Sequence, residues 1–305
     1  MRPNVSPNRL LTAGTWRRGL YKTCVSAPSP ESSAFELAAL FWFYTAFDVC
    51  KERLRELRLR NPRLKIYALY GGPAGEAEEA RRTIGPLCDD FYAHPGFESA
   101  HEKWIAGDRM IAGWHVARGA HLKWDSLFIV QWDFVTLSPL ADLVPGLARG
   151  EAAFSGDRPL AEVSAWWGWA GAGTEAQAAD LAKFRELLAA RYAYDGPLWC
   201  CLFIAAVLPR QFLDEYARSG PPKPGFLEYK LPTLARVFGV PVRPAPALRT
   251  WWRADPSTRT APASERAMSA SKTPIDPALI RVEALRPDGR RAFHPVPFAL
   301  QEQAP

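Results

Sequence analysis

Short apolar runs alternate along the chain with longer amphipathic segments. Runs rich in β-branched and aromatic residues at 64–70, 87–92 and 127–130 are too short for helices and predict buried strands. Residues 75–83 and 98–118, which lie between these runs, have their apolar positions at helical spacing. An alternation of strand and helix favours a parallel sheet with crossover helices.

The first sixty residues are predicted to hold one strand, at 21–27, and one long helix. Ser32 or Ser33 would cap this helix, which would run to about Arg60. Its first half is apolar nearly all round, so it should be buried. The Asn61-Pro62 pair would end it.

The second half of the chain continues the same alternation. Helices are predicted at 139–148, at 174–192, from 209 to about 219, and at 228–238, the last broken near Pro232. Strands are predicted at 151–155 and 199–207, and a weaker one at 240–242. The fold class expected is α/β, with a mixed, mostly parallel central sheet flanked by helices.

Composition shifts divide the chain into four parts. Residues 1–18 read as a flexible arm, and residues 19–252 as one α/β domain. Residues 253–275, rich in Ser, Ala, Thr and Pro, predict a linker or disordered loop. Residues 276–305 form a C-terminal segment with some strand character that could fold back on the active site.

The charge pattern argues against a nucleic-acid partner. The chain has a net charge of +6, but residues 1–65 alone hold 12 Lys and Arg against five acids. The basic excess therefore belongs to the arm and one helix, where a solvated face is favoured and peripheral contact with an anionic membrane is the alternative.

Cysteine usage and hydropathy indicate a soluble protein of the cytoplasm. The five Cys include no CxxC pair, which fits a reducing compartment better than a disulfide framework or a zinc site. The first residues lack the apolar core of a signal peptide. The most apolar run, 37–46, is shorter than the roughly 20 residues that span a bilayer.

One acidic residue stands at the carboxyl end of a predicted strand. The run 127–130 is followed by Gln131-Trp132-Asp133, whereas Asp125 stands at the strand's entrance and is interpreted as structural. Ligands of open α/β sheets bind just outside the carboxyl ends of strands. Asp133 is therefore a candidate ligand of a metal-bound diphosphate, and a surface Asp after a buried strand is the equal alternative.

Two further groups are candidate nucleotide-sugar contacts. Asp108 and Arg109 interrupt an apolar helix and could face a cleft, although exposure on its polar face is the default reading. Tyr70-Gly71-Gly72 follows a strand, and its glycines would let the backbone approach a ligand closely, although an ordinary turn explains them equally well.

Aromatic and charged residues of the second half complete the set. Trp166, Trp167 and Trp169 cannot all face one side of an element, so at least one could stack on an acceptor sugar. The guanidinium group of Arg158 either binds a phosphate or takes part in an internal ion pair. Glu228 is either a general base or a residue that stabilises the start of a helix.

Taken in order, these segments resemble the GT-A-type nucleotide-diphospho-sugar glycosyltransferases. LKIYALYGG resembles an early strand and loop, EKWIAGDRMIAGWHVARG the helix before the metal strand, and LFIVQWDF the strand that carries the DxD motif. FLEYKLPTLARVFG is similar to the late Glu-bearing segment, and RAFHPV to a segment that supplies a metal-ligating His. Gln131 replaces the first Asp of the DxD motif.

The resemblance implies a single Rossmann-type GT-A domain and a sugar transfer. Asp133 and His294 would hold Mn²⁺ or Mg²⁺, which neutralises the leaving diphosphate, and Glu228 would activate an acceptor hydroxyl. The residues expected to bind the nucleotide-sugar are Tyr70, Gly71, Gly72, Asp108, Arg109, Gln131, Trp132 and Arg158, and those expected to bind the acceptor are Trp166 and Trp167.

The partners implied are a nucleotide-sugar donor and a glycan or lipid-linked acceptor, as in polysaccharide biosynthesis at the cytoplasmic face of a membrane. Two alternatives stay open. One is a non-catalytic nucleotide- or carbohydrate-binding protein on the same fold, and the other is a nucleotidyltransferase, which would place two or three carboxylates on its metal.

Overall fold

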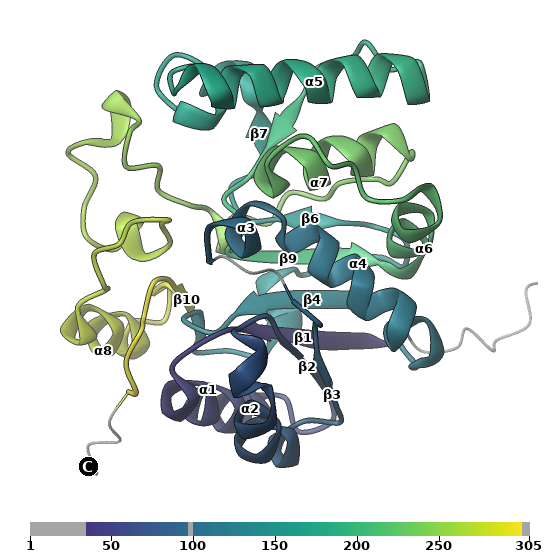
Figure 1. Ribbon diagram of the computed structural model, residues 1–305. Coiled ribbons are helices and arrows are strands. Elements are labelled where there is room, and N and C mark those ends of the chain that lie inside the picture. Colours follow the sequence, from purple (N-terminus) through teal and green to yellow (C-terminus); the bar gives the residue numbers. More distant parts are fainter. Residues whose placement is uncertain (1–34, 97–99, 301–305) are drawn as a thin grey trace, which may run out of the picture. The chain divides into compact units, whose positions relative to one another are not determined.

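A six-stranded sheet forms the centre of the fold, as the computed structural model shows for residues 35–96 and 100–300 (Figure 1). The predictions for the arm at 1–18, the strand at 21–27 and the caps Ser32 and Ser33 lie outside these described residues. In spatial order the strands are β3 (Asp90–Ala93), β2 (Lys65–Tyr70), β1 (Leu37–Phe43), β4 (Ser126–Gln131), β9 (Ala205–Pro209) and β6 (Ala153–Phe154). Strands β3, β2, β1 and β4 pair in parallel, and β9 is antiparallel to both of its neighbours. The expected mixed, mostly parallel α/β sheet is confirmed.

The central strand β1 corrects the prediction of one long helix up to Arg60. Residues Leu37–Phe43 are extended and buried, and the helix begins only at Phe47. Ala46 turns the chain between them with φ 52°, in the left-handed region. A strand covered on both faces is apolar throughout, so its sequence lacks the alternation that separates a strand from a buried helix.

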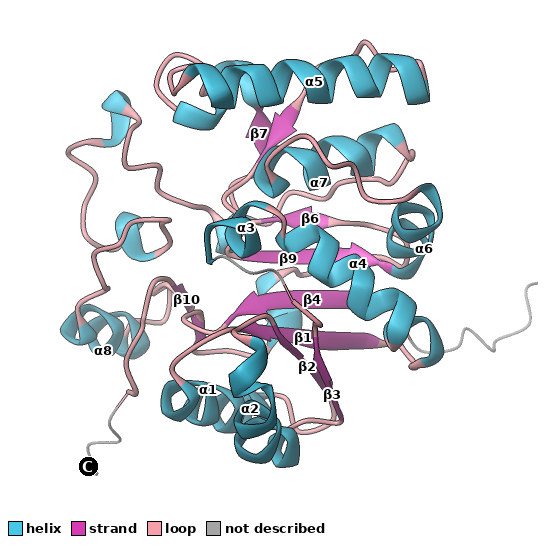
Figure 2. Ribbon diagram, viewed as in Figure 1, coloured by secondary structure: helices cyan, strands magenta, loops and turns pink. Residues whose placement is uncertain are grey.

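Eight α-helices are described, and those that follow the first strands flank the sheet (Figure 2). They are α1 (Phe47–Arg60), α2 (Ala77–Ile84), α3 (Ala100–Ile105), α4 (Gly107–Ala117), α5 (Glu175–Tyr192), α6 (Arg210–Ser219), α7 (Leu227–Val237) and α8 (Pro277–Leu285). Figure 1 shows α1 and α2 together on one side of the strands and α4 on the other. This arrangement follows from right-handed crossovers, because the chain moves outward from β1 to β3 and then returns across β1 to β4. No helix in the described stretches has the length and apolar character needed to span a membrane.

Three predicted elements are shorter than expected or divided. The helix predicted at 98–118 is divided at Ala106, where Gly107 lies so close to Trp42 that an added Cβ would be 2.3 Å from its ring. The strand predicted at 199–207 is divided into β8 (Trp199–Cys200) and β9, and β8 pairs with β7 (Arg158–Pro159). In place of the helix predicted at 139–148 there is a 3₁₀ turn at Leu140–Leu143.

The C-terminal elements up to residue 300 pack against the strand end that carries Asp133. Strand β10 (Ala292–Phe293) pairs antiparallel with β5 (Val135–Thr136), and α8 forms where strand character was expected. A small second core joins these elements, with members Val135, Ala267, Ile275, Ile280, Phe293 and Val296. Within 253–275, Met268 is fully buried and forms an isolated β-bridge with His294. Part of the predicted linker is therefore a core element in this structure.

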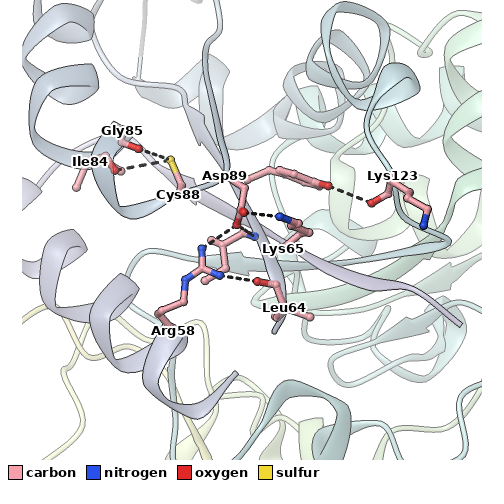
Figure 3. A network of polar contacts seen from close by, with 10 residues as sticks. Arg58, Leu64, Lys65, Ile84, Gly85, Cys88, Asp89 and Lys123 are labelled. Carbon is pink, nitrogen blue, oxygen red and sulfur yellow. Dashed lines mark hydrogen bonds and ion pairs between the residues drawn. The ribbon is translucent and has the colours of Figure 1, made fainter. Parts of the chain in front are cut away.

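A polar network at the opposite end of the sheet ties α1 to β2 and β3. The Asp89 carboxylate accepts hydrogen bonds from Arg58 (2.7 Å) and from Lys65 (2.9 Å), as Figure 3 shows. It also accepts one from the Ile66 amide (2.9 Å). Burial alone would raise the pKa of Asp89, but the bonds from Arg58, the Ile66 amide and Lys65 outweigh it and lower the pKa to about 2. The carboxylate therefore stabilises the fold in its ionised form.

We expect Asp89→Asn to lower the free energy of unfolding by about 1–2 kcal/mol at pH 7. An ordinary Asp ionises near pH 3.8, so this stabilisation is present above pH 3.8 and is lost as the pH falls towards 2. Urea unfolding at pH 7 and pH 2.5 measures it, and the difference between wild type and variant should shrink at the lower pH. Lys65→Met is the control. The Lys65 side chain is 61% exposed, so its ion pair with Asp89 should contribute less to the free energy of unfolding than the whole set of bonds to Asp89. An equal difference at both pH values would contradict the assignment.

Candidate active site

The sheet has one topological switch point, between β1 and β4. From β1 the chain passes to β2 on one side, and β4 lies on the other side. Ligands of open α/β sheets bind in the crevice that such a reversal creates at the carboxyl ends of the strands. Tyr44 follows β1, Gly71 follows β2, and Trp132 with Asp133 follows β4.

At this edge the structure brings together the two predicted metal ligands. The Nε2 atom of His294 lies 3.2 Å from Oδ1 of Asp133, and both side chains are nearly buried. Neither atom has a hydrogen-bond partner among the described residues. The Nδ1 atom of His294 lies 2.6 Å from the carbonyl oxygen of Ser269, which can only accept, so Nδ1 carries a proton. In neutral His294, Nε2 then presents a lone pair to Asp133, and two facing lone pairs require a proton or a cation between them.

The backbone around Asp133 and His294 is held from two directions. The Val296 amide donates to the Asp133 carbonyl at 2.8 Å, and the Val296 carbonyl accepts from Arg53 of α1 at 3.0 Å. Arg53 is 3% exposed and also donates to the Phe298 carbonyl. These bonds fix the C-terminal segment against the end of β4, so the separation of the two side chains is set by the fold.

The pair fits a divalent cation. With bonds of about 2.1 Å, two ligands at right angles around an octahedral ion lie about 3.0 Å apart. A metal-ligating His usually donates its second ring N–H to a carbonyl or carboxylate, as His294 does to Ser269. Within the described ranges no group of three or more His, Cys, Asp or Glu side chains could hold an ion. The remaining ligands would have to come from a phosphate and water, the usual arrangement for Mg²⁺.

Two indoles lie near the switch point. Nε1 of Trp42 is buried without an acceptor in the part of the chain that the structure describes, and the Trp132 side chain interacts with the Tyr44 hydroxyl. Tyr44, 40% exposed, lies edge-on to Trp132 at 6.1 Å. Trp114 and Trp252, away from this edge, have buried Nε1 atoms of the same kind, so the Trp42 donor does not by itself mark a ligand site. Of the residues at this edge only Trp132 was predicted; Trp42 and Tyr44 were missed because the run FWFY was read as helix.

Glu228, the predicted base, lies in the first turn of α7 and is 7% exposed. Its Oε1 accepts from the Phe203 amide at 2.7 Å, and the Phe203 carbonyl accepts from Gln131. Burial raises the pKa of Glu228 to about 8, although the Phe203 amide acts in the opposite direction. The carboxyl group therefore titrates close to neutral pH, as a general acid or base requires. Gln131 is thus connected to Glu228 through one peptide unit.

Asp108 is placed differently from the prediction. It is fully buried, and its Oδ2 lies 2.8 Å from Nζ of Lys230, with Tyr216 donating to the same oxygen. Its carboxylate thus joins α4 to α7 and is closed off from an entering ribose in this structure. Arg109 is partly exposed and pairs with Glu102 at 3.3 Å.

The Tyr70-Gly71-Gly72 segment is explained by packing. Tyr70 is 1% exposed, and its hydroxyl donates to the Pro73 carbonyl at 3.1 Å, so the ring faces the core. An added Cβ on Gly72 would meet this ring at 2.2 Å, and one on Gly71 would lie 2.7 Å from Sδ of Met110. Gly71 stands at the carboxyl edge of the sheet, but the two glycines are required by their neighbours whether or not a ligand binds.

Trp252 is in contact with three of the predicted site residues, Arg158, Trp166 and Trp167. Arg158 lies over the Trp252 ring at 5.7 Å and within 3.8 Å of both Glu162 and Asp255. These contacts match the internal ion pair that was the alternative reading of Arg158.

The two predicted acceptor tryptophans are held by the same ring. Trp166 and Trp167 pack edge-on to Trp252 at 5.7 and 5.2 Å, and Trp167 is 9% exposed. The third indole of the group, Trp169, stacks on Phe226 at 4.4 Å, and Trp167 packs against the same ring at 6.2 Å. The indoles that were expected to bind the acceptor therefore serve mainly the core.

The chain is an α/β protein with a mixed, mostly parallel six-stranded sheet flanked by helices. No protein-family model and no curated protein matches the sequence. Among solved structures, the chain is similar to the apo structure of the bifunctional glycosyltransferase WbbM, with 11% identity and a TM-score of 0.44 over 82% of this chain. It is also similar to the inositol-1-phosphate CTP transferase from T. maritima, with 8% identity and a TM-score of 0.40 over 70% of this chain and 85% of the other. The chain spans 48% of the WbbM structure's length, and both likenesses concern the fold alone.

Proposed function

We propose that this protein is a glycosyltransferase that uses a nucleotide-diphospho-sugar and a divalent cation. The observation that carries the proposal is the Asp133–His294 pair, whose facing atoms lie 3.2 Å apart without hydrogen-bond partners. It stands beside the switch point, where α/β sheets bind nucleotides. A cation bound there would supply positive charge to the leaving diphosphate.

The chain's own residues would take three roles. Asp133 and His294 hold the cation, and Tyr44 with Trp132 offers an aromatic wall for the nucleotide or the sugar. Glu228 accepts the proton of the acceptor hydroxyl, and its raised pKa suits this step near neutral pH. Gln131 and the Phe203 peptide orient the Glu228 carboxylate.

A thermal-shift panel of UDP, GDP, CDP and TDP, each with and without Mn²⁺, tests the donor site. We expect at least one diphosphate to stabilise the protein only when Mn²⁺ is present, by about 2.7 kcal/mol at 100 times the Kd. Asp133→Ala and His294→Ala should each remove this stabilisation. The proposal fails if no diphosphate stabilises the folded protein.

A matched control is available on the same strand. Asp125 lies at the opposite end of β4, where it accepts from the Glu36 amide at 2.9 Å and pairs with Arg149 at 2.7 Å. Asp125→Asn can lower the melting temperature but should leave the ligand-induced shift unchanged. Loss of the shift in this variant would locate the effect in general stability and not at Asp133.

A non-catalytic nucleotide-binding protein is the second candidate, favoured by the small number of protein ligands. At this edge of the sheet Asp133 and His294 approach a shared position, and no group of three or more such side chains that could hold an ion is found among the described residues. Release of the nucleoside diphosphate from a panel of nucleotide-sugars separates the two functions. Slow hydrolysis that disappears in Asp133→Ala supports the transferase, whereas Mn²⁺-dependent binding without any turnover supports the binding protein.

A further inference from the structure

An open groove of about 640 Å³ lies between α3, the start of α5 and the segment before α7. Six of its residues carry the argument that follows: Trp104, Trp169, Thr174, Gln177, Asp180 and Lys223. None of them belongs to the proposed donor site. The volume lies in the range of pockets that bind small molecules.

The groove has an aromatic wall that is both exposed and rigid. Trp104 is 47% exposed, although an indole of this size is usually covered. Its ring lies edge-on to Trp169 at 5.5 Å and to the buried Phe226 at 5.0 Å. Trp169 in turn stacks on Phe226 at 4.4 Å. The two indoles are therefore held on a core residue with their planes at 73° to each other, so little conformational entropy is lost when an apolar group binds in the corner between them.

Oriented polar groups stand at the rim of this wall. Oδ2 of Asp180 accepts from the Gly225 amide at 2.9 Å and from the Tyr229 hydroxyl at 3.3 Å, which fixes the carboxylate. Gln177 accepts from the Thr174 amide at 2.9 Å through its Oε1, so its NH₂ is the end that remains to donate. Lys223 is exposed and adds a cationic donor. Acceptor and donor groups thus surround a stacking surface.

We propose that this groove binds a pyranose ring of a neutral oligosaccharide. The apolar face of the ring would lie on the exposed Trp104, its edge would meet Trp169, whose plane is at 73° to that of Trp104, and its hydroxyls would bond to Asp180, Gln177 and Lys223. The lining has one acid and one base, so an anionic chain such as a nucleic acid would meet Asp180 without a run of cations. Its aliphatic side chains are confined to Ile105 and Ala176, too few for the apolar face of a helical peptide.

Titration calorimetry without nucleotide or metal tests the groove. The probes are maltohexaose, cellohexaose, mannohexaose and a β-1,4-galactohexaose, added to the whole chain up to millimolar concentration. We expect saturable binding of at least one, with Trp104→Ala weakening it at least tenfold, about 1.4 kcal/mol. Lys223→Ala should weaken the same interaction. Both side chains are exposed, so the variants should fold, which circular dichroism verifies.

Leu285→Ala is the control, because this side chain is 87% exposed on α8, outside the groove. It should leave the affinity unchanged. Absence of binding by all four probes, or unchanged affinity in both groove variants, overturns the proposal. Neither outcome bears on the donor site, which the Mn²⁺-dependent diphosphate shift tests separately.

Discussion

Glu228→Gln is expected to slow sugar transfer by about 10²–10⁴-fold, the usual contribution of a general base. Gln keeps the oxygen that accepts from the Phe203 amide, so the position of α7 should be preserved. It cannot accept the proton of an acceptor hydroxyl. In the wild type, the transfer rate should rise with pH through about 8 and level off above it, because the base must be ionised. The variant should lose this dependence.

The same substitution is expected to stabilise the protein. In the unfolded chain Glu228 ionises near pH 4.5, whereas burial holds its proton in the folded chain up to about pH 8. The folded state binds more protons in this window, so wild-type stability falls as the pH rises through it. Gln carries no such loss, and the free energy of unfolding at pH 8 should rise by about 1–3 kcal/mol.

Urea unfolding at pH 5 and pH 8 measures this difference, and it should be larger at pH 8. Glu215→Gln is the matched control, since this partly exposed carboxylate of α6 pairs only with Arg218 among the described residues. It should change neither the pH–rate profile nor the pH dependence of stability. A Glu228→Gln variant that is less stable than the wild type at pH 8 would show that the ionised carboxylate supports the fold.

Asp108→Ala is expected to cause the largest loss of stability, about 3–5 kcal/mol, because it leaves the charge of Lys230 buried without a counter-charge. Lys230 is 1% exposed, and Nζ also donates to the Pro222 carbonyl at 3.2 Å. Thermal unfolding should show a fall in Tm of about 6–12 °C. The control is Arg218→Ala, which breaks an exposed ion pair of α6 and should change stability by less than about 1 kcal/mol.

A double variant separates the ion pair from packing. Asp108→Leu with Lys230→Met removes both charges, and its loss should be smaller than that of Asp108→Ala. Since Lys230 lies two residues after Glu228 on α7, each single variant should also reduce activity. A single variant as stable as the wild type would contradict the buried pair.

Local sequence patterns were sufficient to predict most of the helices and strands, because these elements are amphipathic or end at residues that interrupt regular structure. The strand before Gly71, the strand before Gln131 and the helix after Thr174 all occur near their predicted positions. The central strand β1 could not be recognised, because burial on both faces makes it apolar at every position. Because β1 was not predicted, neither the switch point nor the position of Tyr44 after this strand was recognised.

The candidate site was predictable where a residue follows a strand, and not where tertiary contacts decide its direction. Asp133 continues β4, so its position at the carboxyl edge followed from the pattern. The approach of His294 rested on a resemblance, since nothing local sets its distance from Asp133. The neighbours of Asp108 along its helix are the same whether the side chain faces a cleft, solvent or the interior. The structure shows it in the interior, where it contacts Lys230 of α7.

The Arg53 contacts have a consequence for the order in which the sheet and the candidate site form during synthesis. Arg53 and the Val296 carbonyl are separated by 243 residues, and this bond helps to hold His294 beside Asp133. During synthesis, β1 to β4 can pair before this segment leaves the ribosome, so the sheet can form while the site is still open. Closing it joins α1 to the C-terminal segment, and ligands bound there would protect the amides of Phe293, His294 and Val296 from hydrogen exchange.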